Sequence, residues 1–140
     1  MRGRVNVGGS NYDEVIGIPI LEEGQQYYGG IFALEILDDH IYVGGEGEYQ
    51  AQFVWKVNPD DLSIIGQSPA YLGAIKSIAT DGAFIYVGGA STRKVWKIDP
   101  NDMSKVGESP PYPETINTIA YCNGFIFYGG GESTTSRKLF

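Results

Sequence analysis

Short apolar runs, separated by turn-forming residues, organise this chain. The clearest series has four strand-like runs, at residues 75–80, 83–87, 94–98 and 104–107. The second run is apolar at successive positions rather than at alternate ones, which is typical of a strand whose two faces are both covered. The pattern therefore predicts a unit of four antiparallel strands, which we label A to D in chain order.

The same unit recurs along the chain. The apolar run and double glycine at residues 41–45 return at 85–89 and at 126–130, with offsets of 44 and 41 residues. Residues 54–69 match residues 95–110, and nine of these sixteen positions are identical. Both copies include an Asn/Asp-Pro corner that fits a type I turn between strands C and D. A covered four-stranded unit that repeats at this interval predicts an all-β fold built from β-propeller blades.

The repeats also resemble a known class of sequence. The apolar run that ends in a double glycine, followed by Val-Trp-Lys-Ile-Asp-Pro at residues 95–100, resembles kelch-type and YVTN-type propeller repeats. The resemblance extends from Ile31 to the C-terminus, although the tryptophan that kelch repeats place after the Asp-Pro turn is absent. It implies a propeller and carries no chemistry by itself, because such propellers include enzymes, protein-binding platforms and ligand-binding modules.

The repeats divide the chain into about three blades. We expect residues 31–73 and 74–113 to form blades and residues 114–140 to form a partial blade, with residues 1–30 supplying strands C and D of a shared blade. Propellers close with about four to eight blades, so three cannot close a ring. We therefore expect a homodimer that closes a six-bladed ring by strand exchange. The alternative is that the sequence is a fragment of a longer propeller.

Composition excludes several classes of function. Ten basic and 17 acidic residues give a net charge of −7, which is the wrong sign for binding nucleic acid. A single cysteine, Cys122, excludes an intrachain disulfide, and a single histidine, His40, excludes a multi-histidine metal site within one chain. We expect no cofactor. No signal peptide or membrane-spanning segment is visible, so the default location is the cytoplasm.

One end of the blades is the predicted binding face. In a propeller the connections from strand D to strand A and the loops from B to C emerge at the same end. Tyrosines suit such a surface because they combine a large rigid ring with a hydroxyl group. The candidate ligand-binding residues are Tyr27, Tyr71 and Tyr112 in the connections, and Glu46, Glu48, Tyr49, Ser91, Thr92, Arg93, Glu132, Ser133 and Thr134 in the loops. The alternative for the tyrosines is that they pack between blades and fix the connections.

The double glycines and a few carboxylates are the remaining features of interest. The glycines follow strand B and predict either a positive φ or a close backbone approach between blades. Glu35 lies in strand A where the other repeats have alanine, so we expect it either to face the central channel or to lie between blades. The sequence Asp38-Asp39-His40 has the groups for acid and base chemistry, but it falls at a turn between strands A and B and is expected to be solvated.

These observations favour a non-enzymatic binding or interaction module, because no blade collects a nucleophile, a base and an orienting group. The expected partners are a second copy of the chain and an unknown protein, small molecule or carbohydrate. Two alternatives remain open. One is a metal-dependent hydrolase-type propeller in which channel carboxylates such as Glu35 converge from several chains. The other is a purely structural ring, or a fragment of a larger propeller protein.

Overall fold

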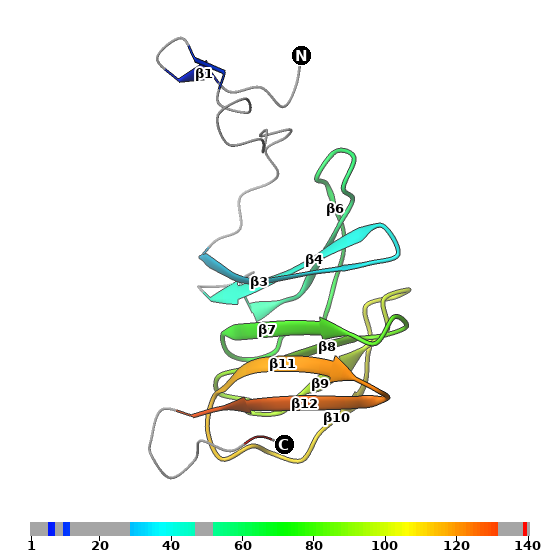
Figure 1. The fold of residues 1–140 in the computed structure, drawn as a ribbon. Helices are drawn as coiled ribbons and strands as arrows, with labels where there is room; N and C mark the ends of the chain where they lie inside the picture. The colour runs from blue at the N-terminus through cyan, green and yellow to red at the C-terminus, as the bar shows by residue number, and fades with distance from the viewer. Residues whose placement is uncertain (1–5, 8–9, 12–28, 47–51, 132–138, 140) are drawn as a thin grey trace.

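The computed structural model describes residues 6–7, 10–11, 29–46, 52–131 and 139, and these residues form stacked antiparallel sheets (Figure 1). The strands are β1 (Asn6–Val7), β2 (Ser10–Asn11), β3 (Gly30–Leu37), β4 (His40–Glu46), β5 (Trp55–Val57), β6 (Ile64–Gln67), β7 (Ile75–Thr80), β8 (Ile85–Gly89), β9 (Trp96–Ile98), β10 (Lys105–Glu108), β11 (Ile116–Cys122) and β12 (Phe125–Gly130).

The sheets follow the repeat. Strands β3 to β6 form one four-stranded sheet in sequential order, β7 to β10 form a second, and β11 pairs with β12 in a third. We call these sheets blade 1, blade 2 and blade 3. In Figure 1 they lie one above another, with β7 of blade 2 between β3 of blade 1 and β11 of blade 3. The predicted all-β fold with four-stranded antiparallel units is confirmed.

Strand boundaries agree with the prediction for strand A of blade 2 and differ for strand B. The predicted strand at residues 75–80 is β7. The predicted strand at 83–87 is β8, but it begins at Ile85 and continues through Gly88 and Gly89. Both glycines pair with β7, Gly88 with Ser77 and Gly89 with Ile75. The double glycine is therefore part of the strand and does not merely follow it.

Close packing, and not a positive φ, explains the double glycines. No glycine in the three pairs at 44–45, 88–89 and 129–130 has a positive φ, so that interpretation was wrong. A Cβ atom on Gly89 would lie 1.8 Å from the carbonyl oxygen of Ala74 in the preceding segment of the same blade. A Cβ atom on Gly88 would lie 2.8 Å from the Cγ2 atom of Ile116 in blade 3. The first glycine thus admits a side chain from the next blade, and the second admits the backbone of its own blade.

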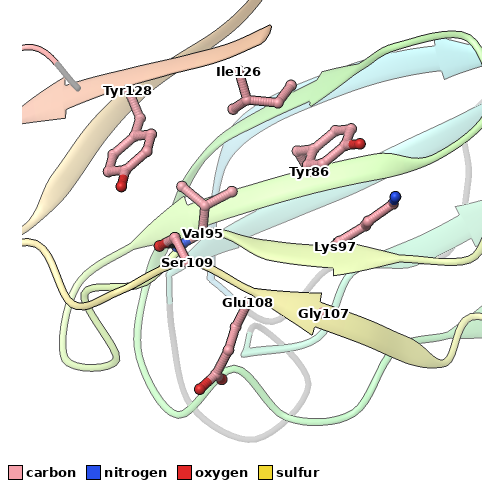
Figure 2. Close-up of a pocket in the computed structure, with 8 residues that line it drawn as sticks. All are labelled: Tyr86, Val95, Lys97, Gly107, Glu108, Ser109, Ile126 and Tyr128. Atoms are coloured by element: carbon pink, nitrogen blue, oxygen red, sulfur yellow. Dashed lines mark hydrogen bonds between the residues drawn. The ribbon is translucent and has the colours of Figure 1, made fainter. Parts of the chain in front are cut away.

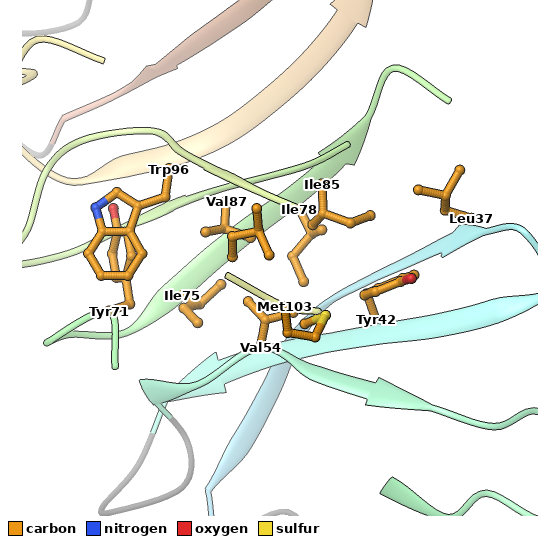
Figure 3. Packing of buried hydrophobic residues seen from close by; sticks show 11 residues of the cluster. Leu37, Tyr42, Val54, Tyr71, Ile75, Ile78, Ile85, Val87, Trp96 and Met103 are labelled. Atoms are coloured by element: carbon orange, nitrogen blue, oxygen red, sulfur yellow. The ribbon is translucent and has the colours of Figure 1, made fainter. Parts of the chain in front are cut away.

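The hydrophobic core lies between the blades. The largest cluster joins Tyr42 and Val54 of blade 1 to Ile75 and Ile78 on β7, and Figure 3 shows these side chains facing one another. Ile116 and Ile119 on β11 pack against blade 2 in the same way, beside Ala79 and Val95. Each interface therefore buries two isoleucines of an inner strand against the preceding blade, and burial of such side chains is the main driving force for stacking.

Of the two described C–D corners, at residues 58–61 and 99–102, the second adds a further anchor between blades. At the second corner, the Met103 N–H donates to the Asp99 carbonyl, and Met103 adopts a φ of 61°. This places the Met103 side chain in the core, where its Cγ would lie 3.1 Å from a Cβ atom on Gly66 of blade 1. The ammonium group of Lys56 donates to the Pro100 carbonyl oxygen at 2.7 Å. The corner of blade 2 therefore touches the outer strands of blade 1.

The N-terminal hairpin differs from the prediction. The sequence aligns residues 8–13 with a turn, whereas the structure places β2 at Ser10–Asn11 and pairs Val7 with Ser10. The predicted strand D at residues 14–17 lies outside the described residues.

Across the described ranges, no helix has both the length and the apolar character that a membrane crossing would need.

Candidate functional site

The predicted binding face corresponds to one end of blades 2 and 3. We call it the loop end and define it by residues 69–74, which lead into β7, residues 90–93, which follow β8, and residues 110–114, which lead into β11. The segments lie together because β7 begins where β8 ends. The Ala90 N–H donates to the Ala74 carbonyl oxygen at 2.9 Å, which ties the first two segments to each other.

The two described tyrosines of this end are buried. Tyr71 is 1% exposed, and its hydroxyl group donates to the Lys94 carbonyl oxygen at 2.6 Å. Its ring meets the indole of Trp96 edge-on, with 5.0 Å between the ring centroids. The Tyr112 hydroxyl lies 3.2 Å from the Gly130 carbonyl oxygen. Both side chains fix the connections to their blades and leave little surface for a ligand.

Two tyrosines with raised pKa values make the fold sensitive to alkaline pH. Burial raises the pKa of the Tyr71 hydroxyl to about 12. Burial, together with the hydrogen bond that its hydroxyl donates to Asp81, raises the pKa of Tyr86 to about 12. An unfolded tyrosine titrates near pH 10, so the stabilisation is complete below about pH 10 and is lost as the pH rises towards 12.

We therefore expect a Tyr86→Phe variant to lose less stability than the wild type between pH 10 and 12. Urea unfolding followed by circular dichroism across this range measures the effect. The difference in free energy of unfolding between the wild type and the variant should shrink as the pH rises. Parallel pH profiles for the two proteins would contradict the assignment.

The exposed part of the loop end is small and held in an unusual backbone conformation. Leu72 is 69% exposed and has a φ of 65°. Ser91 and Arg93 are also exposed, with φ values of 60° and 54°. A positive φ costs energy in residues other than glycine, and such strain is concentrated at functional sites.

Hydrogen bonds hold these exposed residues in place. The Thr92 hydroxyl donates to the Tyr71 carbonyl oxygen. The Arg93 guanidinium donates through Nη1 to the Pro113 carbonyl oxygen at 2.9 Å. The loop after β8 is thereby tied to the connections on both sides of blade 2, so Leu72 and Arg93 project from a fixed frame.

The other predicted loop residues fall into two groups. Glu46, the last residue of β4, is exposed and lies 3.4 Å from the ammonium group of Lys76 on the neighbouring blade. The remaining candidates, Tyr27, Glu48, Tyr49, Glu132, Ser133 and Thr134, lie outside the described residues.

The carboxylates considered for catalysis do not come together. Glu35 is half-buried on β3, and its Oε1 accepts a hydrogen bond from the neighbouring Ile36 N–H at 2.9 Å. Asp38 and Asp39 form the turn between β3 and β4, and Nδ1 of His40 lies 2.8 Å from the Asp38 carbonyl oxygen. Within the part of the chain that the structure describes, no three His, Cys, Asp or Glu side chains are grouped so as to hold a metal ion.

A groove between blades 2 and 3 was not anticipated from the sequence. It has a volume of about 290 Å³ and opens at the outer strands of blade 2 (Figure 2). Its lining residues are Tyr86, Val95, Lys97, Gly107, Glu108, Ser109, Ile126 and Tyr128. Most of its wall is apolar.

Two charged residues border this groove. The Lys97 ammonium group lies 3.9 Å from the centroid of the Phe84 ring. Hydrogen bonds from Lys105 and Lys94 lower the pKa of Glu108 to about 2. Both charges therefore already have partners within blade 2, and the groove offers mainly apolar contact.

The sequence does contain signals for the two features that were not predicted, the exposed Leu72 and the groove between blades 2 and 3. Leu72 directly follows the repeated tyrosine, at a position where the next repeat has proline. The groove is bordered by the repeated Ser-Pro pair, whose serine caps the start of strand C. The Val95 N–H donates to the Ser109 hydroxyl at 2.9 Å, and the Val54 N–H donates to Ser68 in the same way.

No protein-family model matches the chain, and no curated protein matches it. Solved structures do. The WD40 repeats of RRP9 match with a TM-score of 0.64 and 10% identity, over 75% of this chain and 34% of that one. The WD40 propeller domain of Doa1 matches with a TM-score of 0.61 and 10% identity, over 75% and 36%. Hydrazine synthase of Kuenenia stuttgartiensis matches with a TM-score of 0.60 and 18% identity, over 75% and 30%.

These likenesses show the fold. The chain has the fold of part of a β-propeller, and it spans about a third of the length of the structures it matches.

Proposed function

We propose that this chain is a non-enzymatic protein-interaction module that presents the loop end of its propeller blades to a partner protein. The likeness to WD40 propellers supports an interaction role. The observation that carries the proposal is the exposed Leu72, which is held at a positive φ beside Ser91 and Arg93. Arginine is one of the residue types that contribute most to binding at protein interfaces, and the exposed Leu72 beside it offers apolar contact area.

The metal-dependent hydrolase alternative is not favoured. The Glu35 carboxylate accepts a hydrogen bond from the neighbouring Ile36 N–H. Asp38 belongs to the turn between β3 and β4, at the opposite end of blade 1 from Glu46. A small-molecule or carbohydrate ligand at the loop end stays a prediction, as do the kelch-type or YVTN-type subclass and the cytoplasmic location.

Self-association is the second part of the proposal. Two copies of the three blades would supply six, which lies within the range of known propellers. Because a partner at the loop end and a second copy would use different surfaces of the blades, each part can be tested without the other.

Peptide selection on the purified protein tests the loop end. Peptides from a random display library, selected on the wild type, are expected to bind at Leu72 and Arg93. A Leu72→Asp/Arg93→Glu variant should then bind them at least about tenfold more weakly, since it removes the apolar anchor and reverses a charge. Isothermal titration calorimetry measures the affinities.

A variant at the opposite end of the blades serves as the control. Asp39→Ser/Asp60→Ser changes two exposed turn residues and should leave peptide affinity unchanged. If the control weakens binding as much as the loop-end variant does, or if neither variant affects binding, the loop end is not the interaction surface.

A further inference from the structure

The interface between blades 1 and 2 and the interface between blades 2 and 3 are built in the same way. In blade 2, Ile75 pairs with Gly89 and points its Cγ2 to within 2.6 Å of where a Cβ atom on Gly44 of blade 1 would lie. In blade 3, Ile116 pairs with Gly130 and approaches Gly88 of blade 2 in the same way, at 2.8 Å. Each inner strand thus inserts its isoleucine beside the first glycine of the preceding blade.

Blade 1 carries the inserting side of this interface, and the described residues form no blade that receives it. Ile31 pairs with Gly45 on β4, exactly as Ile75 pairs with Gly89, so Ile31 is the counterpart of Ile75 and Leu34 is the counterpart of Ile78. Ile75 and Ile78 are buried, whereas Ile31 is 54% exposed and Leu34 is 61% exposed. We call this surface of β3 the leading face.

A half-formed core lies behind the leading face. Val43, Trp55 and Val57 form a buried cluster of their own on blade 1. By the repeat they correspond to Val87, Trp96 and Ile98, which in blade 2 belong to the large cluster shared with blade 1. The leading face is therefore built to continue a core, which distinguishes it from scattered apolar exposure.

Blade 3 carries the receiving side. Phe127 on β12 is the counterpart of Tyr86, which packs towards the next blade, and Phe127 itself is 39% exposed. Gly129 on the same strand is the counterpart of Gly44 and Gly88. We call this surface the trailing face.

The groove between blades 2 and 3 marks a second part of the same junction. Its Lys97 and Gly107 correspond to Lys56 and Gly66, which in blade 1 contact the corner of the next blade through Pro100 and Met103. Beside blade 3, no described residue plays the part of that corner. Leu139 forms a bridge with Gly129 on β12, and by the repeat Leu139 is the counterpart of Val95, which directly precedes β9 in blade 2.

We propose that a second copy of this chain occupies both faces, with the leading face of each copy packed on the trailing face of the other. This rests on the self-association proposed above and names its contacts: Ile31 and Leu34 of one copy lie beside Gly129 and Phe127 of the other. A second copy fits because its leading face has the same residue types, at the same pairing positions, as the two strands that already fill this interface within the chain.

The groove takes the first hairpin of that second copy. Strands β1 and β2 precede β3 in the chain, as β9 and β10 precede β11. When β3 of the second copy lies on the trailing face, its β1 and β2 are in sequence order to cover the apolar groove at the outer side of blade 3. Two identical junctions would then join the copies head to tail, and six blades lie within the range in which propellers close.

Light scattering from about 1 to 100 μM tests the assembly. The expected mass is twice 15.3 kDa. Ile31→Asp/Leu34→Asp on the leading face, and Phe127→Asp on the trailing face, should each weaken the dimer about 100-fold, because a carboxylate would be buried without a partner. A monomeric wild type across this range, or a series of larger species, would overturn the two-chain ring.

Mixing the leading-face variant with the trailing-face variant distinguishes the proposed contact from non-specific association. Each variant keeps one intact face, so the mixture should form a one-to-one complex through a single good junction. The matched control is Ile65→Asp/Val106→Asp, which changes two residues that are each 50% exposed on the outermost strands. If the control also dissociates the dimer, or if the mixture stays monomeric, the face-to-face contact is wrong.

A disulfide trap gives a readout that does not depend on weakened variants. In the two internal interfaces, a Cβ atom on the first glycine would lie 3.1 and 3.2 Å from the isoleucine Cβ. A disulfide needs about 3.5 to 4.5 Å, so a shift of a few tenths of an ångström between the two faces would accommodate the bond. Ile31→Cys/Gly129→Cys, in a Cys122→Ser background, should form covalent dimers under oxidising conditions. Covalent dimers that persist in the Leu72→Asp/Arg93→Glu variant would show that assembly is independent of the loop end. Absence of the cross-link would count against the junction even if peptides bind the loop end.

Discussion

Replacing Gly89 with alanine is expected to destabilise the protein by about 3 kcal/mol or more. The new Cβ atom would lie 1.8 Å from the Ala74 carbonyl oxygen, and that oxygen belongs to a backbone segment leading into β7. A side chain can rotate away from such a clash, but here the pairing of Ile75 with Gly89 must shift. Urea unfolding monitored by tryptophan fluorescence, with the denaturant slope compared between variants, measures the loss.

Gly107 provides the matched control for this substitution. It also lies in a strand, but the nearest atom to a Cβ there is the Lys97 Cβ at 3.7 Å, which is an ordinary contact distance. Gly107→Ala should therefore change stability by less than about 1 kcal/mol. Equal effects of the two substitutions would show that strand glycines matter here through backbone entropy and not through the close approach of two strands.

Trp96→Ala is expected to cost about 3 to 5 kcal/mol, the range for truncating a large aromatic side chain in a core. The Trp96 indole packs edge-on against Tyr71 and belongs to the cluster that joins blades 1 and 2. The ammonium group of Lys105 lies 4.5 Å from the centroid of its ring. Alanine would leave a cavity at the point where the connection into β7 is held against blade 2. Thermal and urea unfolding both report the effect.

Trp96→Phe separates packing from hydrogen bonding at this position. The indole Nε1 of Trp96 is buried and has no acceptor among the described residues, so its removal loses no hydrogen bond. The phenylalanine variant should keep most of the aromatic contact and lie much closer to the wild type than the alanine variant does. A stability of Trp96→Ala equal to that of the wild type would refute the assignment of Trp96 to the core.

The repeat made much of the fold predictable because equivalent residues occupy equivalent positions in successive blades. Identical spacing of apolar runs predicted four-stranded units, and strand A at residues 75–80 has the predicted bounds. The glycine pairs were only half predicted. Sequence shows that a side chain is missing at Gly88, but whether backbone dihedral angles or a neighbouring isoleucine requires this depends on how two blades stack, which lies outside any local pattern.

The candidate site was less predictable for a related reason. Tyr71 and Tyr112 looked suited to ligand binding because of their residue type and position, yet their hydroxyl groups bond to backbone carbonyls inside the blades. Leu72 looked like an ordinary apolar residue, and only its dihedral angles and exposure single it out. The groove depends on which outer strands lie beside blade 3. The residue types show which functional groups the chain contains. How the blades stack determines which of these groups are exposed at the surface.

The near-identity of residues 54–69 and 95–110 has a consequence for how the chain reaches its native state. Each of these hairpins carries Trp-Lys before its corner and one large apolar residue, Leu62 or Met103, at its positive-φ position. Each hairpin therefore carries most of the residue types that pack at the position of the other. A chain in which the two hairpins exchange places would lose few of its local contacts. Exchange of neighbouring units is a characteristic error of repeat proteins. The differences between the two corners, such as Lys105 over Trp96, are what penalise the swapped arrangement, so these small departures from the repeat encode the order of the blades.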